Sequence, residues 1–195
     1  MKRILLLQGH PDGGSAHLCH ALAGAYAEGA RDAGHEVRTV DVAHLEFPLL
    51  RSQQAWEKEP LPEGLQQAQQ DIAWAEHLVL FFPLWLGDMP ALLKGFLEQV
   101  ARPGFAFAAD EGRTAFTRKG LTGRSARVVV TMGMPALVYR WYFRAHSVKS
   151  LERNILGFVG IAPVHETLIG SVGQLAPDAA EKAFERLRRL GREAG

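Results

Sequence analysis

Residues 77–96, HLVLFFPLWLGDMPALLKGF, contain the clearest signal of the chain's fold. The segment 77–82 begins with His77 and continues as an apolar run, which is typical of a β-strand buried on both faces of a sheet. Pro90 then suits the first turn of a helix, and apolar side chains recur after it at helical spacing. The members of this buried helix face are Leu93, Phe96, Leu97 and Val100. The stretch therefore predicts a strand–loop–helix unit with an unusually apolar loop.

The same alternation continues in both directions along the chain. Further apolar or β-branched runs predict strands at residues 4–7, 36–42, 127–131 and 166–169. One helix is expected between an N-cap at Ser15 and a stop at Gly34. Other helices are expected at residues 63–75 and 147–158 and after Pro177. The chain thus repeats the strand–helix unit five times.

Repeated strand–helix units with right-handed crossovers give a parallel sheet with helices on both faces. Five strands without a half-repeat favour the flavodoxin-like order 2-1-3-4-5 over a six-stranded Rossmann sheet. We therefore expect one α/β domain over residues 1–195, a flavodoxin-like three-layer sandwich. Residues 43–62 and 102–125 are too long for plain connections and are candidates for site walls or a partner interface.

Composition narrows the class of protein. Hydrophobic residues make up 47% and charged residues 22%, as in ordinary globular proteins. The net charge of +1 argues against a nucleic-acid partner. No apolar run approaches the length of a membrane span. Cys19 is the only cysteine, which precludes an internal disulfide and suits a reducing cytoplasm.

In an open parallel sheet, ligands bind beyond the carboxyl ends of the strands, at the topological switch point. Here that means the loops after the first, third and fourth strands. Residues 9–18 are rich in glycine and run into a helix, so free N–H groups and the helix dipole would hold a phosphate. The spacing matches neither G-x-G-x-x-G nor a Walker loop, and one terminal phosphate, as on FMN, fits it. The structural alternative is that Ser15 only caps the helix.

The other two loops are also unusual. Residues 82–90 place Trp85 and Leu86 at the mouth of the sheet, where an apolar segment could cover a flat ring. Residues 131–135 contain Gly133, which would permit close approach of a ligand to the backbone. Packing of Trp85 against the core or a subunit, and an ordinary turn at Gly133, are the alternatives for each loop alone. Three such loops at the three expected strand ends together favour a ligand site.

With these motifs, the sequence resembles the NAD(P)H quinone reductases of the DT-diaphorase type, over essentially the whole chain. This family includes bacterial NADPH-dependent oxidoreductases and ancillary reductase subunits of potassium efflux systems. Residues 82–96 carry the most specific part of the resemblance, and residues 9–17 and 131–134 look like the family's other two flavin loops. His17 stands where the family often has Asn, and Met134 where it often has a second Gly.

The resemblance implies FMN, with FAD as the alternative, and NADPH or NADH as hydride donor to a quinone or similar small acceptor. It also implies a homodimer, and it admits peripheral association with a membrane transporter. The residues that it places at the flavin phosphate are His10, Ser15, Ala16, His17 and Leu18. Those at the flavin ring are Pro83, Leu84, Trp85, Leu86, Thr131, Met132, Gly133 and Met134. Tyr139 and His146 would contact substrate or stabilise the reduced flavin, or else form a packed or surface pair.

Two other function classes remain open from the sequence. One is a non-enzymatic electron carrier of the flavodoxin kind, although carriers tend to be acidic and the net charge of +1 favours an enzyme. The other is a zinc hydrolase, because His10-Pro11-Asp12 resembles the start of the His-Pro-Asp-Asp motif of zinc deacetylases. Gly13 replaces the second Asp of that motif, and hydride transfer through a flavin requires no metal.

Overall fold

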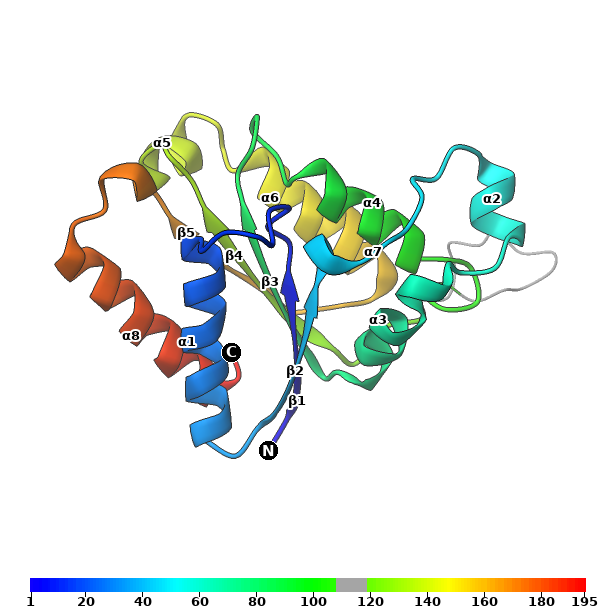
Figure 1. The fold of residues 1–195 in the computed structure, drawn as a ribbon, viewed down its shortest axis with the longest axis horizontal. Helices are drawn as coiled ribbons and strands as arrows, with labels where there is room; N and C mark the ends of the chain where they lie inside the picture. Colours follow the sequence, from blue (N-terminus) through cyan, green and yellow to red (C-terminus); the bar gives the residue numbers. More distant parts are fainter. Residues whose placement is uncertain (108–118) are drawn as a thin grey trace.

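A computed structural model describes residues 1–107 and 119–195. Its centre is a five-stranded parallel sheet in the order β2-β1-β3-β4-β5, which confirms the predicted strand order (Figure 1). Every residue of the middle strand, β3, is buried, as its continuous apolar run predicts. The strands are β1 (Arg3–Gln8), β2 (Glu36–Asp41), β3 (His77–Pro83), β4 (Ser125–Thr131) and β5 (Val164–Ile169).

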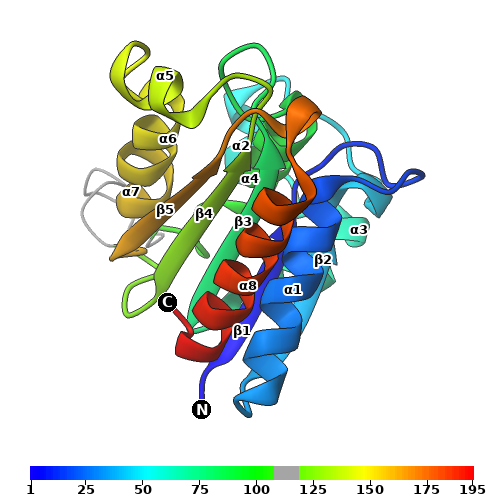
Figure 2. The ribbon, with the colours of Figure 1, turned by 90° about the vertical axis from the view of Figure 1, so that its left-hand side faces the viewer.

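Helices cover both faces of the sheet and make three layers (Figure 2). Successive strand residues point to opposite faces, so Ile4 and Leu6 pack in one core and Leu5 and Leu7 in the other. The first core lies under α1 (Leu18–Asp32) and α8 (Pro177–Glu193). Elements that cover the second face include α3 (Glu63–Trp74), α4 (Ala91–Val100), α6 (His146–Ser150), η2 (Leu151–Leu156) and α7 (Gly157–Val159). The flavodoxin-like three-layer sandwich is thereby confirmed.

Several details differ from the sequence-based expectation. The predicted N-cap at Ser15 is wrong: α1 begins at Leu18, its N-cap is His17, and Ser15 is exposed. The helix expected at residues 147–158 is present as α6, η2 and α7 without a break, but η2 is π-helical. Short segments that the sequence did not predict are η1 (Val42–His44), α2 (Gln53–Lys58), α5 (Ala136–Trp141) and η3 (Val172–Gln174).

The long segments expected to be irregular are only partly accounted for. Residues 43–62 contain α2, whose N-cap Ser52 accepts a hydrogen bond from the Ala55 N–H at 3.0 Å. Of the second segment, residues 102–125, the part from 108 to 118 lies outside the described residues. None of the described helices is long and apolar enough to cross a membrane.

Helices α1 and α8 pack backbone to backbone because two glycines permit it. A Cβ on Gly29 would lie 1.9 Å from the Arg188 carbonyl oxygen, and a Cβ on Gly191 would lie 2.2 Å from the Tyr26 carbonyl oxygen. Gly24, in the same helix as Gly29, is exposed and has nothing within 4 Å of that position. The contact therefore gives one glycine of α1 a packing role that the other does not have.

Alanine substitutions at these two glycines should change stability in opposite directions. We expect Gly24→Ala to raise the free energy of unfolding by about 0.5–1 kcal/mol, because alanine is the better helix former. Gly29→Ala should lower it by about 1–3 kcal/mol, because the new methyl group forces α1 and α8 apart. Urea denaturation followed by circular dichroism measures both, and stabilisation by Gly29→Ala would contradict the close packing.

Candidate functional site

The three loops singled out from the sequence lie together at the carboxyl edge of the sheet. The Gly9 N–H donates to the Phe81 carbonyl at 2.7 Å, which ties the first loop to β3. The Leu84 N–H donates to the Thr131 carbonyl, also at 2.7 Å, which ties the second loop to β4. The rings of His10 and Trp85 meet edge to face with centroids 5.8 Å apart. The predicted juxtaposition of the loops is therefore present.

The first loop ends in a row of backbone donors. The amide N–H groups of residues 15–18 donate no hydrogen bond to any part of the chain that the structure describes. They stand at the N-terminus of α1, where the helix dipole adds partial positive charge. Beside them, the buried ring of His10 stacks on His17 with centroids 3.7 Å apart. This arrangement suits an anion.

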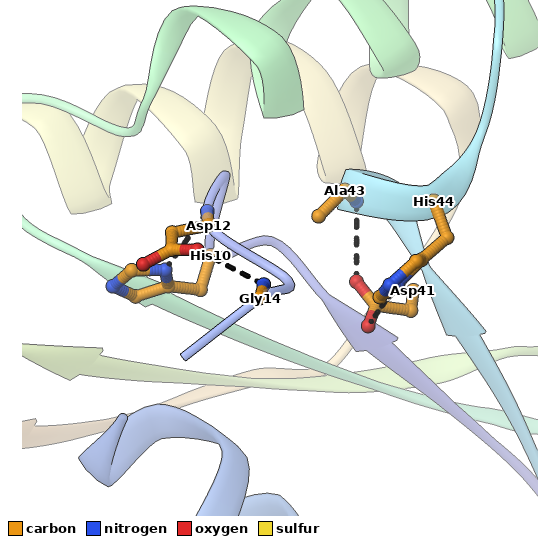
Figure 3. Close-up of polar contacts among 6 residues, drawn as sticks. All are labelled: His10, Asp12, Gly14, Asp41, Ala43 and His44. Atoms are coloured by element: carbon orange, nitrogen blue, oxygen red, sulfur yellow. Dashed lines mark hydrogen bonds and ion pairs between the residues drawn. The ribbon is translucent and has the colours of Figure 1, made fainter. Parts of the chain in front are cut away.

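An anion of the chain itself already occupies part of this loop (Figure 3). Asp12 Oδ1 accepts from the Gly14 N–H at 2.9 Å, and Asp12 Oδ2 lies 2.7 Å from His17 Nε2. The hydrogen bond from His17, then that from Gly14 and then the Ser15 hydroxyl hold the pKa of Asp12 at about 2. Asp12 is therefore a carboxylate at neutral pH. Burial lowers the pKa of His10, and the nearby His17 and His20 lower it further.

A second aspartate–histidine pair forms a wall beside the first loop (Figure 3). Asp41 Oδ1 accepts from the Ala43 N–H at 3.1 Å, and Asp41 Oδ2 lies 2.9 Å from His44 Nδ1. A Cβ on Gly13 would lie 2.4 Å from His44 Cε1. The close approach of His44 thus explains why the loop has a glycine at position 13.

The second loop is a tight turn that projects an apolar side chain. Trp85 and Asp88 exchange backbone hydrogen bonds of 2.9 and 3.0 Å, and between them Leu86 has φ +48° and Gly87 φ +84°. A left-handed leucine costs about 1–2 kcal/mol, and here its side chain is fully exposed. The amides of Leu86 and Gly87 have no acceptor among the described residues. Strain that exposes an apolar group and two donors is typical of a binding site.

A cavity of about 270 Å³ opens between the second and third loops. Its lining is mostly apolar with a few polar groups, as in small-molecule sites. The lining residues are Leu84, Leu86, Gly87, Met134, Tyr139, Phe143, His146 and Ser147. A larger cavity of about 330 Å³, between α4 and α7, contains none of the predicted site residues.

Tyr139 and His146, the two residues predicted to act on substrate, both line the cavity between the second and third loops but differ in exposure. Tyr139 is buried, and its hydroxyl is 2.6 Å from Ser147 Oγ and accepts from the Val148 N–H at 3.3 Å. It therefore fastens α5 to α6. His146 is exposed at the cavity rim and stands free to contact a ligand.

The residues predicted in the third loop differ in exposure. Thr131 and Met132 are buried, and the Thr131 hydroxyl lies 3.1 Å from the Cys19 sulfur, which links α1 to β4. Burial raises the pKa of that thiol to about 11. Gly133 is exposed, and a Cβ there would meet nothing within 4 Å, so space for a ligand lies next to it.

The sequence placed Asp12 only in the zinc alternative, and it assigned neither Asp12 nor Phe143 to the flavin site. A usable signal existed for Asp12, because Asp followed by two glycines is typical of an Asx turn. Nothing in the sequence indicated Phe143, whose place at the cavity depends on the unpredicted helix α5. For the zinc alternative, the described residues contain no group of three or more His, Cys, Asp or Glu side chains placed to hold a metal.

Comparisons with known proteins agree with this geometry. Residues 2–190 match the model of a family described by its flavodoxin-like fold. An uncharacterized NAD(P)H oxidoreductase from Haemophilus influenzae is 30% identical over 128 residues, which are 65% of this chain and 61% of that protein. The chain thus spans less than two thirds of that relative.

Two further relatives match over nearly their whole length. An FMN-dependent NADH:quinone oxidoreductase from Nitratidesulfovibrio vulgaris is 26% identical and covers 99% of this chain and 100% of that protein. The solved structure of an NAD(P)H:quinone oxidoreductase from Methanothermobacter marburgensis is 26% identical, with a TM-score of 0.79 over 98% and 96% of the two chains. The chain belongs to the family described by its flavodoxin-like fold, and it is similar to proteins named as NAD(P)H and NADH:quinone oxidoreductases.

Proposed function

We propose that the protein is a flavin-dependent NAD(P)H oxidoreductase that moves hydride from NADH or NADPH to a quinone or similar small acceptor. The observation that carries this proposal is the row of unpaired amides at residues 15–18, set beside the apolar cavity between the second and third loops. The names of the relatives, an NADH:quinone oxidoreductase that depends on FMN among them, support the same activity. When bound, FMN supplies the hydride chemistry.

The residues present fit such a cofactor. A carboxylate, Asp12, already takes hydrogen bonds from the first loop, so the donors there suit an anionic group. We assign the phosphate to Ser15, Ala16, His17 and Leu18, with His10 behind them. The flat ring is assigned to Pro83–Leu86 on one side and Thr131–Met134 on the other. The free amides of Leu86 and Gly87 would stabilise negative charge on the ring.

The same geometry suggests how substrates are handled. His146 is exposed at the cavity rim and is the group that we expect to contact the acceptor. Tyr139 acts as a positioning residue, because Ser147 already engages its hydroxyl. The apolar lining excludes water from the place where hydride moves.

A homodimer is supported by an exposed apolar surface next to the cavity. The exposed members of this surface, on and after α5, are Leu137, Val138, Trp141, Tyr142 and Phe143. Monomeric proteins rarely leave so many large apolar side chains together in water. A second copy over this surface would close the cavity. A cytoplasmic location, one domain over residues 1–195 and association with a membrane transporter stay predictions.

The electron-carrier alternative is less well supported. A carrier needs only an exposed ring edge, whereas this chain builds a cavity of about 270 Å³ beside the proposed ring position. The relatives to which the chain is similar are also named as oxidoreductases. Steady-state oxidation of NADH or NADPH in the presence of a quinone separates the two classes.

The bound cofactor should be FMN and not FAD. The row of amides at residues 15–18 provides one anion site at one helix N-terminus, which suits a single terminal phosphate. Cofactor released by heat from the purified or flavin-loaded protein should therefore elute as FMN in chromatography. Recovery of stoichiometric FAD would show that a second phosphate and an adenosine also find a place.

A negative charge at position 15 should weaken FMN binding. Ser15 is exposed, so Ser15→Asp should leave the fold intact. Repulsion between the new carboxylate and the phosphate is expected to cost about 1–4 kcal/mol, or roughly fivefold to several hundredfold in Kd. Ser15→Ala removes only the hydroxyl and should change Kd far less. Fluorescence titration measures both variants, and equal affinities for FMN would place the phosphate elsewhere.

The hydride donor, NADPH, and the quinone acceptor should bind and react one after the other in the same cavity. The cavity of about 270 Å³ lies just below the usual size range of ligand sites, which begins at about 300 Å³. It therefore holds one planar substrate at a time. Double-reciprocal plots for NADPH at several quinone concentrations should be parallel, and converging lines would require a separate second site.

A further inference from the structure

The Asp12 carboxylate stands inside the loop that we assign to the flavin phosphate. Its two oxygens take the Gly14 N–H and the His17 ring, at 2.9 and 2.7 Å. The His17 ring must donate in the second of these bonds, because an ionised carboxylate only accepts. Together with the Ser15 hydroxyl, these donors of one short loop are thus already committed to an anion that belongs to the chain.

A phosphate at residues 15–18 would compete for the same groups. His17 is both the partner of Asp12 and the N-cap of α1, so its ring stands at the helix end where the free amides gather. Two anions within one donor set repel each other strongly when they are a few ångströms apart. The Asp12 side chain is 46% exposed, so it has room to turn toward solvent.

We propose that Asp12 is an internal competitor of the flavin phosphate: its carboxylate occupies the His17 ring of the phosphate loop and yields it when FMN binds. This inference rests on the proposed function. It makes Asp12 a specificity-determining residue, because it lowers affinity for phosphorylated flavin and leaves affinity for riboflavin, which lacks the phosphate, unchanged. The direction is opposite to that of an ordinary site residue, whose loss weakens binding.

Asp12→Asn separates the charge of Asp12 from its shape. The Asn side-chain oxygen can still accept the Gly14 N–H, because Asn forms the same local turn. The loop is thereby kept while its internal anion is removed. Asp12→Ser serves as a second variant, since a serine hydroxyl also supports this kind of turn.

The neighbouring Asp41 offers a matched control (Figure 3). It has the same local pattern, with one oxygen on the Ala43 N–H at 3.1 Å and the other 2.9 Å from His44. His44 approaches Gly13 of the first loop, and neither of these two hydrogen bonds of Asp41 involves residues 15–18. Asp41→Asn therefore removes one nearby negative charge without freeing a donor of the phosphate loop.

The test is a titration of flavin-free protein with FMN and, separately, with riboflavin, followed by quenching of flavin fluorescence. Asp12→Asn should bind FMN about tenfold tighter than the unchanged protein or more, and riboflavin within about twofold. Asp41→Asn should change the Kd for either flavin by less than about twofold. Asp12→Ser should follow Asp12→Asn, and thermal melting of each flavin-free variant reports whether it folds.

The contrary results are distinct from one another. Weaker binding of both flavins by Asp12→Asn would mean that Asp12 builds the loop, which overturns the competitor role and leaves the proposed function standing. Equal tightening of FMN and riboflavin, or equal tightening by Asp41→Asn, would also overturn it, because the charge would then not act on the phosphate. Failure of the unchanged protein to bind either flavin would overturn the proposed function itself.

Discussion

The candidate site depends on the parallel pairing of β3 with β1 on one side and with β4 on the other. In this register Gln8 pairs with Phe81, and Pro83 pairs with Thr131. Because all three strands run in the same direction, the loops that follow them must leave the sheet at one edge. The buried side chains of β3 hold this arrangement in place, because they alternate between the two hydrophobic cores, one on each face of the sheet.

At this edge of the sheet, the loops combine unpaired backbone N–H groups with exposed apolar side chains. The first loop leaves four amides free at a helix end, and the Asp12 carboxylate is held by the neighbouring Gly14 N–H and His17 ring. The second loop holds Leu86 in a left-handed conformation and leaves two more amides free. The left-handed Leu86 costs free energy in the unbound chain, and the free amides can donate to an anionic group. Both features support the proposal that the site binds FMN.

The fold followed from the sequence because its signals are local and strong. Continuous apolar runs identified the strands, and the alternation with helices fixed their direction and order. The features that the sequence did not reveal depend on contacts between distant residues or on competing local bonds. Ser15 looked like an N-cap, but Asp12 takes the Gly14 N–H and the chain enters α1 only after His17. The partner of the Tyr139 hydroxyl, Ser147, lies on α6 and became evident only once α5 was placed.

The central claim is that the three loops at the strand ends hold FMN. The most direct measurement is a set of amide ¹H–¹⁵N spectra of the labelled protein recorded during addition of FMN. We expect the signals of the non-proline residues within 9–18, 84–89 and 131–134 to shift together, in step with the quenching of flavin fluorescence. Shifts confined to the cavity between α4 and α7, at residues such as Leu97 and Ile155, with the three loops unchanged, would contradict the account.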